Sequence, residues 1–219
     1  MQIVANNIAN AATTGYRQEG LIFSEHVQAV DGGESVSMAH GNVRNTSFEQ
    51  GALTQTGGTF DMAIEGDGFF LVETPSGPRL TRSGAFSPNA QGDLVTLDGY
   101  RVLDAGGAPL FIPPGASDLS VSPDGTLSTD GRPLGQIGLV APVNALGLSR
   151  EDGVMFRSDE GVEPAPAARV LQGFVEGSNV NAISQLSRMI EVQRAYELGA
   201  SFMETEDERV RQSLKTLSE

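Results

Sequence analysis

The sequence predicts a mainly β protein with terminal α-helices, in which an antiparallel β domain is inserted between an N-terminal and a C-terminal helix. Three observations indicate this fold class. Apolar residues recur in alternating steps of four and three near both ends of the chain, which is the spacing of helices that pack side by side. Short apolar segments separated by turn residues fill the middle, as in antiparallel sheets. The chain also has 27 glycines and 11 prolines, which suit many turns.

The first residues predict a helix over Gln2–Ala12. Three residues carry its four–three spacing, Val4, Ile8 and Ala11. Gly15 suits the left-handed residue that follows many helices. Asparagine amides compete for backbone groups, so the asparagines at positions 6, 7 and 10 are tolerable in so short a helix if they bond outside it. A helix of this length needs a partner, and we expect the two terminal helices to pair as a coiled-coil-like axial unit.

Residues 1–42 are expected to contain this helix and an extended linker. The apolar residues between positions 16 and 27 suit an extended segment, whereas residues 29–42 are predicted to form a loop. His26 and His40 fall here, but neither has the spacing of a metal ligand with another candidate. We therefore expect both histidines to be solvated or packed.

Residues 43–174 are expected to form a β-rich outer domain, because turn residues recur about every eight to twelve positions. The pairs Asp98-Gly99, Asp124-Gly125 and Asp130-Gly131 suit hairpin turns, since Asp-Gly tolerates positive φ. The expected strands are Phe60–Glu65, Phe69–Val72, Arg79–Arg82, Leu94–Leu97, Tyr100–Leu103, Leu119–Val121, Gln136–Ala141 and Arg169–Val175.

Residues 175–219 are expected to form a C-terminal axial helix over Ala182–Leu217, with Asn179 or Asn181 as its N-cap. Charges such as Asp207 and Arg211 are spaced for ion pairs along the helix. We call its four–three stripe the seam, in which Gln193 and Asp207 are the polar exceptions. The predicted assembly interface combines both ends of the chain and consists of Val4, Ile8, Ala11, Ala182, Leu186, Met189, Gln193, Tyr196, Ala200, Met203, Asp207, Val210, Leu214 and Leu217.

Composition excludes several classes of function. The net charge of −14, with scattered cations, argues against nucleic acid, whose binders need a basic face. The absence of cysteine excludes disulfides and thiolate chemistry. No apolar run approaches a membrane span, and no cleavable signal peptide is expected. We find no phosphate loop, dinucleotide motif or calcium loop, and the acidic residues of the C-terminal helix suit a solvated face. We therefore expect no cofactor, no metal, no catalytic residue and no enzyme.

Four segments carry a family resemblance. They are ANNIANAATTGYR (residues 5–17), GALTQTGGTFDMAIEGDGFF (51–70), TRSGAFSPNAQGDLVTLDGYRVL (81–103) and EGSNVNAISQLSRMIEVQRAYE (176–197). In this order, with the terminal pair flanking a β insert, they resemble the flagellar basal-body rod and hook proteins. The short middle region looks most like the proximal-rod members, with the distal-rod members second. Family members usually carry more amphipathic helix ahead of the Ala-Asn-Asn motif, where this chain has MQIV, so the resemblance implies that Gln2–Ala12 is the end of such a helix.

The resemblance implies a structural role. Rod proteins are exported unfolded by the flagellar type III export apparatus, without signal cleavage. They polymerise with copies of themselves and with other rod proteins around a central channel, helices inward and β domain outward. The implied location is the periplasm-spanning rod of the basal body, and the polar seam positions would select the register of neighbouring helices. Two alternatives stay open: a distal-rod or hook axial protein, and a secreted β-rich protein that binds or cleaves glycans.

Overall fold

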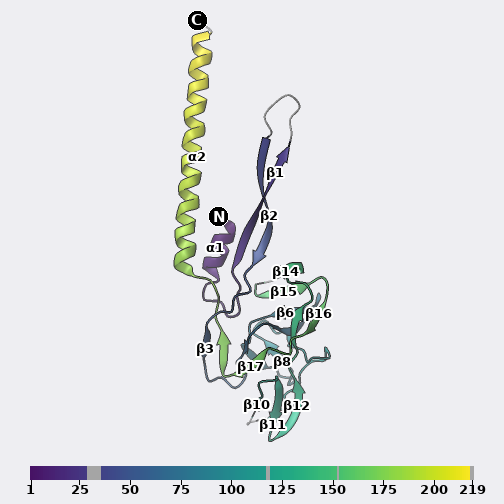
Figure 1. The fold of residues 1–219 in the computed structure, drawn as a ribbon. Helices are drawn as coiled ribbons and strands as arrows, with labels where there is room; N and C mark the ends of the chain where they lie inside the picture. The colour runs from purple at the N-terminus through teal and green to yellow at the C-terminus, as the bar shows by residue number, and fades with distance from the viewer. Residues whose placement is uncertain (29–35, 117–118, 152, 218–219) are drawn as a thin grey trace. The chain divides into compact units, whose positions relative to one another are not determined.

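The computed structural model describes residues 1–28, 36–116, 119–151 and 153–217 (Figure 1). The chain divides into two compact units. The first, which we call the helical unit, combines Met1–Ala9 with Asn181–Glu219, and the second, the β unit, comprises Asn10–Val180. The two ends of the chain therefore share one unit, and the long middle segment forms the other. This arrangement confirms a mainly β chain that has a helix at each end.

The helical unit contains α1 (Gln2–Ala9) and α2 (Ala182–Leu217), which contact each other (Figure 1). The bounds of α2 confirm the prediction from the sequence. Its start is fixed by Asn181, whose Oδ1 accepts a hydrogen bond from the Ser184 amide at 3.1 Å. This is the N-cap geometry, in which a short side chain satisfies a free amide of the first turn.

The predicted end of the first helix is wrong, because α1 stops at Ala9 and Ala11 lies outside it. The Asn10 carbonyl accepts from the Thr13 amide at 3.1 Å, and the Asn10 Oδ1 accepts from the Thr13 hydroxyl at 3.2 Å. These bonds close a tight turn that competes with helical hydrogen bonding. Gly15 does adopt the expected left-handed conformation, with φ +71°, but in a later turn.

The linker region forms a hairpin of β1 (Glu19–Gln28) and β2 (Val36–Thr46), whose backbones pair from Glu19 opposite Thr46 to Gln28 opposite Val36. The predicted loop over residues 29–42 is therefore wrong from Val36 onward, and residues 29–35 lie outside the described residues. The backbone of β2 is held as a strand by its pairing with β1. The composition of β2 alone does not predict this, because strand formation depends on the partner strand. His26 and His40 lie on these strands, and their side chains are outside the described part.

The largest sheet of the described residues is antiparallel and has nine strands. Its main order is β14-β15-β6-β5-β9-β8-β7, and β13 joins β5 and carries β16. The strands are β5 (Phe69–Thr74), β6 (Gly77–Thr81), β7 (Phe86–Pro88), β8 (Leu94–Thr96), β9 (Arg101–Val102), β13 (Leu139–Pro142), β14 (Leu148–Glu151), β15 (Met155–Ser158) and β16 (Val162–Pro164). A short 3-10 helix, η1 (Ala145–Gly147), precedes β14.

Smaller antiparallel pairings complete the β unit. They are β10-β11-β12, β17-β4 and β18-β3. Their strands are β3 (Leu53–Gln55), β4 (Met62–Glu65), β10 (Leu119–Val121), β11 (Thr126–Thr129), β12 (Arg132–Gln136), β17 (Arg169–Gln172) and β18 (Phe174–Glu176). The last predicted strand, Arg169–Val175, is thus broken in two at Gly173, where φ is +76°. The turn of the β11–β12 hairpin has positive φ at both Asp130 and Gly131, which confirms the Asp-Gly prediction there.

The core of the β unit lies on both faces of β5. Phe70 and Val72 point into one cluster, which also holds Met62 and Leu94. Phe69 and Leu71 point into the other cluster, with Leu80 and Phe156. Successive side chains of a strand point to opposite faces, so the run Phe69–Val72 is apolar throughout because both of its faces are covered.

Candidate assembly surface

A buried hydrogen bond joins α1 and α2 within the helical unit. The Asn7 Nδ2 donates to the Gln185 Oε1 at 3.3 Å, and the two residues are 1% and 5% exposed. This bond confirms that the amide of Asn7 has a partner outside its own helix. Met189 and Val192 are partly buried and follow Gln185 by four and seven positions, so they lie on the same side of α2. The α1 contact therefore covers only the first turns of α2.

Apart from Met189, the seam residues of α2 whose side chains are described are exposed. Leu186 and Met203 have exposed fractions of 53% and 67%, and Tyr196 reaches 77%. The predicted interface residues fall into three groups: Val4, Ile8 and Met189 are buried or partly buried in the helices, Ala11 is partly buried outside them, and Ala182, Leu186, Gln193, Tyr196, Ala200, Met203, Asp207, Val210 and Leu214 are exposed. Leu217 belongs to α2, but its side chain is outside the described residues.

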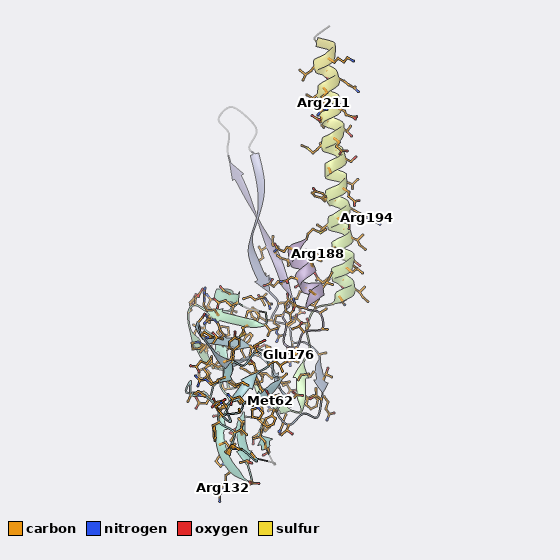
Figure 2. The ribbon with its side chains drawn as sticks, turned by 180° about the vertical axis from the view of Figure 1, so that it is seen from behind. Met62, Arg132, Glu176, Arg188, Arg194 and Arg211 are labelled. Atoms are coloured by element: carbon orange, nitrogen blue, oxygen red, sulfur yellow. The ribbon has the colours of Figure 1, made fainter. Side chains whose placement is uncertain are left out.

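Charged side chains stand out from α2, and Figure 2 shows Arg188, Arg194 and Arg211 projecting from it. Arg211 pairs with Asp207 at 2.8 Å, as its spacing predicts. Arg209 pairs similarly with Glu206 at 2.6 Å. Such exposed pairs contribute little stability, so they support the helix without determining what covers its apolar stripe.

A buried ion cluster lies in the β unit where its two terminal segments meet. The Glu176 carboxylate pairs with the Arg17 guanidinium at 2.8 Å and with the Arg82 guanidinium at 3.1 Å. All three side chains are almost fully buried, with exposed fractions of 1–3%. The Glu176 Oε1 also accepts from the Gly51 amide at 2.9 Å. A buried charge requires such partners, because isolating it from water costs several kcal/mol.

Burial and the charge of Glu176 act in opposite directions on the pKa values of the two arginines of this cluster. Burial lowers the pKa of Arg17 from its ordinary value to about 10, and the negative charge of Glu176 opposes this shift. Burial likewise lowers the pKa of Arg82, again against the effect of Glu176. A pKa near 10 leaves Arg17 protonated at neutral pH. Both guanidinium groups also donate to backbone carbonyl oxygens. Arg17 donates to the Glu49 carbonyl, and Arg82 donates to the Gly66 carbonyl at 2.7 Å.

Backbone bonds hold the same two terminal segments side by side. The Gly15 amide donates to the Glu176 carbonyl at 2.8 Å, and the Asn179 amide donates to the Tyr16 carbonyl at 3.3 Å. The side chain of Asn179 adds a bond from the Gln18 amide to its Oδ1 at 2.6 Å and one from its Nδ2 to the Glu49 carbonyl at 2.8 Å. Hydrogen bonds therefore join the first residues of the β unit to its last residues.

A second buried pair supports the first segment. Arg150 Nε donates to Glu19 Oε1 at 2.7 Å, and Arg150 also donates to the Arg17 carbonyl. Its guanidinium lies over the rings of Tyr16 and Phe156, 4.4 and 4.8 Å from their centroids. Cation–π contacts of this kind strengthen when they are desolvated, so Arg150 anchors residues 16–19 to β14 and β15.

The sequence prediction missed this cluster, although it contained a signal. Arg17, Gly51, Arg82 and Glu176 each lie at or next to one end of one of the four family-like segments. The four residues are well separated along the chain, and the cluster is where they converge. Nothing in the spacing of the residues within a segment predicts that convergence.

Neither helix of the described residues combines the length and the apolar character needed to cross a membrane. Within the same described residues, no group of three acidic or histidine side chains is arranged to hold a metal ion.

Comparison with known proteins places the chain in a family. Residues 63–129 match the model "Flagellar hook protein FlgE/F/G D1 domain", and residues 171–216 match "Flagellar basal body rod FlgEFG protein C-terminal". The flagellar basal-body rod protein FlgF of Caulobacter vibrioides is 39% identical, and that of Mesorhizobium japonicum is 37% identical. Each alignment covers 99% of this chain and 91% of the relative. FlgG of Bacillus subtilis is 31% identical over 95% of this chain and 89% of the relative.

These relatives agree with the order expected from the sequence, with the proximal-rod protein first and the distal-rod protein second. The family is one of structural rod proteins, which confirms the prediction that the chain is not an enzyme. Two matching family models and relatives that align over nearly the whole chain show that it belongs to the flagellar basal-body rod protein family.

Proposed function

We propose that the chain is a structural subunit of the proximal part of the bacterial flagellar rod, and that it polymerises through its terminal helices. The higher identity to FlgF than to FlgG supports the proximal position. The observation that carries the assembly role is the exposed seam of α2, a helix of 36 residues that α1 covers only over its first turns. In this proposal the polymer forms the drive shaft around an export channel.

The energetics favour assembly over an isolated helix. Burying one Leu or Met side chain contributes about 1.5–3 kcal/mol. The exposed Leu186, Tyr196, Met203, Val210 and Leu214 can together outweigh an association cost of roughly 4–15 kcal/mol. Gln193 and Asp207 would then fix the register, because a polar residue in an apolar seam penalises misaligned neighbours.

The remaining parts of the proposal follow from the same role. Residues 1–42 and 175–219 would form the axial part, and residues 43–174 the outer part. Partners would be copies of the chain and other rod proteins, and the subunit would reach the periplasm through the flagellar type III export apparatus without a cleaved signal peptide. The absence of cysteine supports this route, because an unfolded chain then cannot form wrong disulfides in an oxidising space.

Substitutions on the seam test the proposal. We expect Leu186→Asp and Met189→Asp to leave the β unit folded but to abolish rod incorporation and swimming, since a desolvated carboxylate without a cation costs several kcal/mol at every contact. Met203→Asp is the cleaner variant, because Met203 lies beyond the turns that α1 contacts and is 67% exposed. Glu191→Ala is the matched control off the seam.

The readouts are swimming of cells that lack their own copy of the gene and thermal melting of each purified variant. Normal swimming of the Met203→Asp cells would show that the seam is not the assembly surface. A lost melting transition of the β unit would instead assign the defect to folding.

A further inference from the structure

The last part of the β unit completes two of its strand pairs. Residues 169–179, which we call the strap, contain β17 and β18. Among the strands that the structure describes, β4 pairs only with β17, and β3 pairs only with β18. Without the strap, both strands would lack a paired strand, and the backbone of β4, which is mostly buried, requires hydrogen-bond partners.

The strap also supplies an apolar side chain and a charge to the interior of the β unit. Val170 is 2% exposed and belongs to the core cluster that holds Met62. Glu176 supplies the carboxylate between the buried guanidinium groups of Arg17 and Arg82. Without the strap, the core would have a gap and the two arginines would have no buried countercharge, and both changes are costly.

The side chain of Gln172 ties the strap to a further part of the β unit. Its Nε2 donates to the carbonyl oxygens of Thr59 and Leu119, each at 2.9 Å. Its Oε1 accepts from the Val121 amide at 3.0 Å. One strap residue therefore holds β10 to the segment that leads into β4.

Backbone hydrogen bonds run along the strap between these side chains. The Gly173 amide donates to the Asp61 carbonyl at 2.7 Å, and the Gly173 carbonyl accepts from the Thr56 amide at 2.8 Å. The Gly177 amide donates to the Ala52 carbonyl at 2.9 Å. The strap is therefore bonded from β17 to its end at residue 179.

We infer that the β unit folds only when the strap is bound, so that its last segment decides whether the earlier segments fold. The strap bonds to four parts of the unit that precede it in the sequence, residues 15–18, 47–65, 82 and 119–123. A segment that bonds to several others gains these bonds only when all of them are in place. The strap and the rest of the β unit therefore form in one cooperative step.

The order of synthesis gives this dependence a consequence. A chain is made from its N-terminus, so the strap is the last part of the β unit to be made, and residues 180–219 alone follow it in this sequence. The β unit therefore stays unfolded until the chain is nearly complete. Such a delay suits a subunit that is exported unfolded, a link that rests on the proposed function.

A cut ahead of the strap tests the dependence on the full chain. A protease site inserted between Pro166 and Ala167, which are both exposed, allows the folded protein to be cut into residues 1–166 and 167–219. We expect the cut protein to stay folded and its melting temperature to rise with protein concentration, because unfolding now also separates two pieces.

Separation of the two pieces gives the decisive result. After gel filtration in dilute urea and removal of the urea, residues 1–166 should lack the circular dichroism of strands and the protection of their amides from exchange. Adding residues 167–219 should restore both signals. A piece 1–166 that stays folded by itself would overturn the inference.

Variants of the strap separate its contribution from that of α2, which contacts α1 from the same piece. In the cut protein, Glu176→Gln should raise the concentration at which half of the β unit is folded about a hundredfold or more, because two buried cations lose their countercharge. Arg169→Gln is the matched control, since Arg169 lies on the strap with an exposed side chain. Equal concentrations for the two variants would contradict the role of the strap.

Hydrogen exchange of the uncut chain under native conditions is an independent test. The amides of Gly173 and Gly177 should open with the same equilibrium constant as those of β5, because the strap cannot leave while the rest stays folded. Opening of the strap amides at least about tenfold more often than those of β5 would show that the rest of the β unit stands without the strap.

None of these measurements involves a rod, so they separate the strap from the proposed function. Normal swimming of the Met203→Asp cells would remove the support for the proposed function and would leave the dependence of folding on the strap unchanged. A folded piece 1–166 would end the inference about the strap and would leave assembly through the seam untouched.

Discussion

Glu176 and Arg17 form an ion pair of 2.8 Å in which each side chain is only 1% exposed. They are 159 positions apart in the sequence, and the pair joins the first and last segments of the β unit. A pair between such distant segments forms only when the β unit is complete. Together with Arg82, the pair therefore stabilises the β unit only when its first and last segments are in contact.

We expect Glu176→Gln to destabilise the β unit by about 3–5 kcal/mol, because it leaves two buried guanidinium groups without a countercharge. Glutamine keeps the size and an oxygen for the Gly51 amide, so the loss reports the charge. The measurement is urea unfolding of the purified chain.

Glu73→Gln is the control. Glu73 pairs with Arg101 at 2.6 Å, but both side chains are exposed, at 40% and 47%, and the change should cost less than about 1 kcal/mol. Equal unfolding midpoints for the two variants would contradict the importance of the buried cluster.

Gly15 and Gly57 allow a matched comparison of backbone strain and close approach. Their φ values are +71° and +72°. A Cβ at Gly15 would lie 2.3 Å from the Ser83 amide nitrogen, whereas a Cβ at Gly57 would meet nothing within 4 Å. We expect Gly57→Ala to cost about 1–2 kcal/mol from the left-handed backbone alone. Gly15→Ala should cost at least about 1–3 kcal/mol more, since backbone atoms must move apart. Thermal melting distinguishes the two, and equal losses would contradict the close approach.

The sequence predicted α2 to its end residues because a long periodic segment with an asparagine cap contains its own boundaries. Many strands were also located, since apolar runs and Asp-Gly turns are local signals. The end of α1 was misplaced because the Asn10–Thr13 turn replaced a helical turn. The β1–β2 hairpin was partly misread as a loop, because its pairing depends on its partner strand.

The candidate site was predictable only in part. The seam follows from spacing alone, but the choice of Gln185 as the partner of Asn7 depends on how two distant helices pack. Arg17, Arg82 and Glu176 come from three separate segments, and scattered charges ordinarily indicate solvated surface. Only the fold of the β unit brings them together.

Hydrogen exchange should show a gradient along α2 in the isolated subunit. The turns near Gln185 and Val192 contact α1 and should exchange more slowly than the exposed turns from Tyr196 onward. Isolated helical segments are marginal in water without a packed face, so the last turns should fray. The measurement is hydrogen exchange with mass spectrometry on the monomer. Slow exchange through Leu214 would contradict this prediction, because it would mean that another part of the same chain packs on the seam.

The bond between Asn7 and Gln185 should couple α1 to α2. Replacing either side chain with an apolar one, Asn7→Leu or Gln185→Met, takes a partner from a buried polar group and should cost about 1–3 kcal/mol. In the double variant no polar group is left buried without its partner. Its free energy of unfolding should therefore fall by about 1 kcal/mol less than the sum of the two single losses. Asn181→Ala is the control, because it removes the α2 cap for about 1 kcal/mol without touching α1. Urea titration followed by circular dichroism at the helix band measures all four variants, and strictly additive losses would show that the two amides act independently.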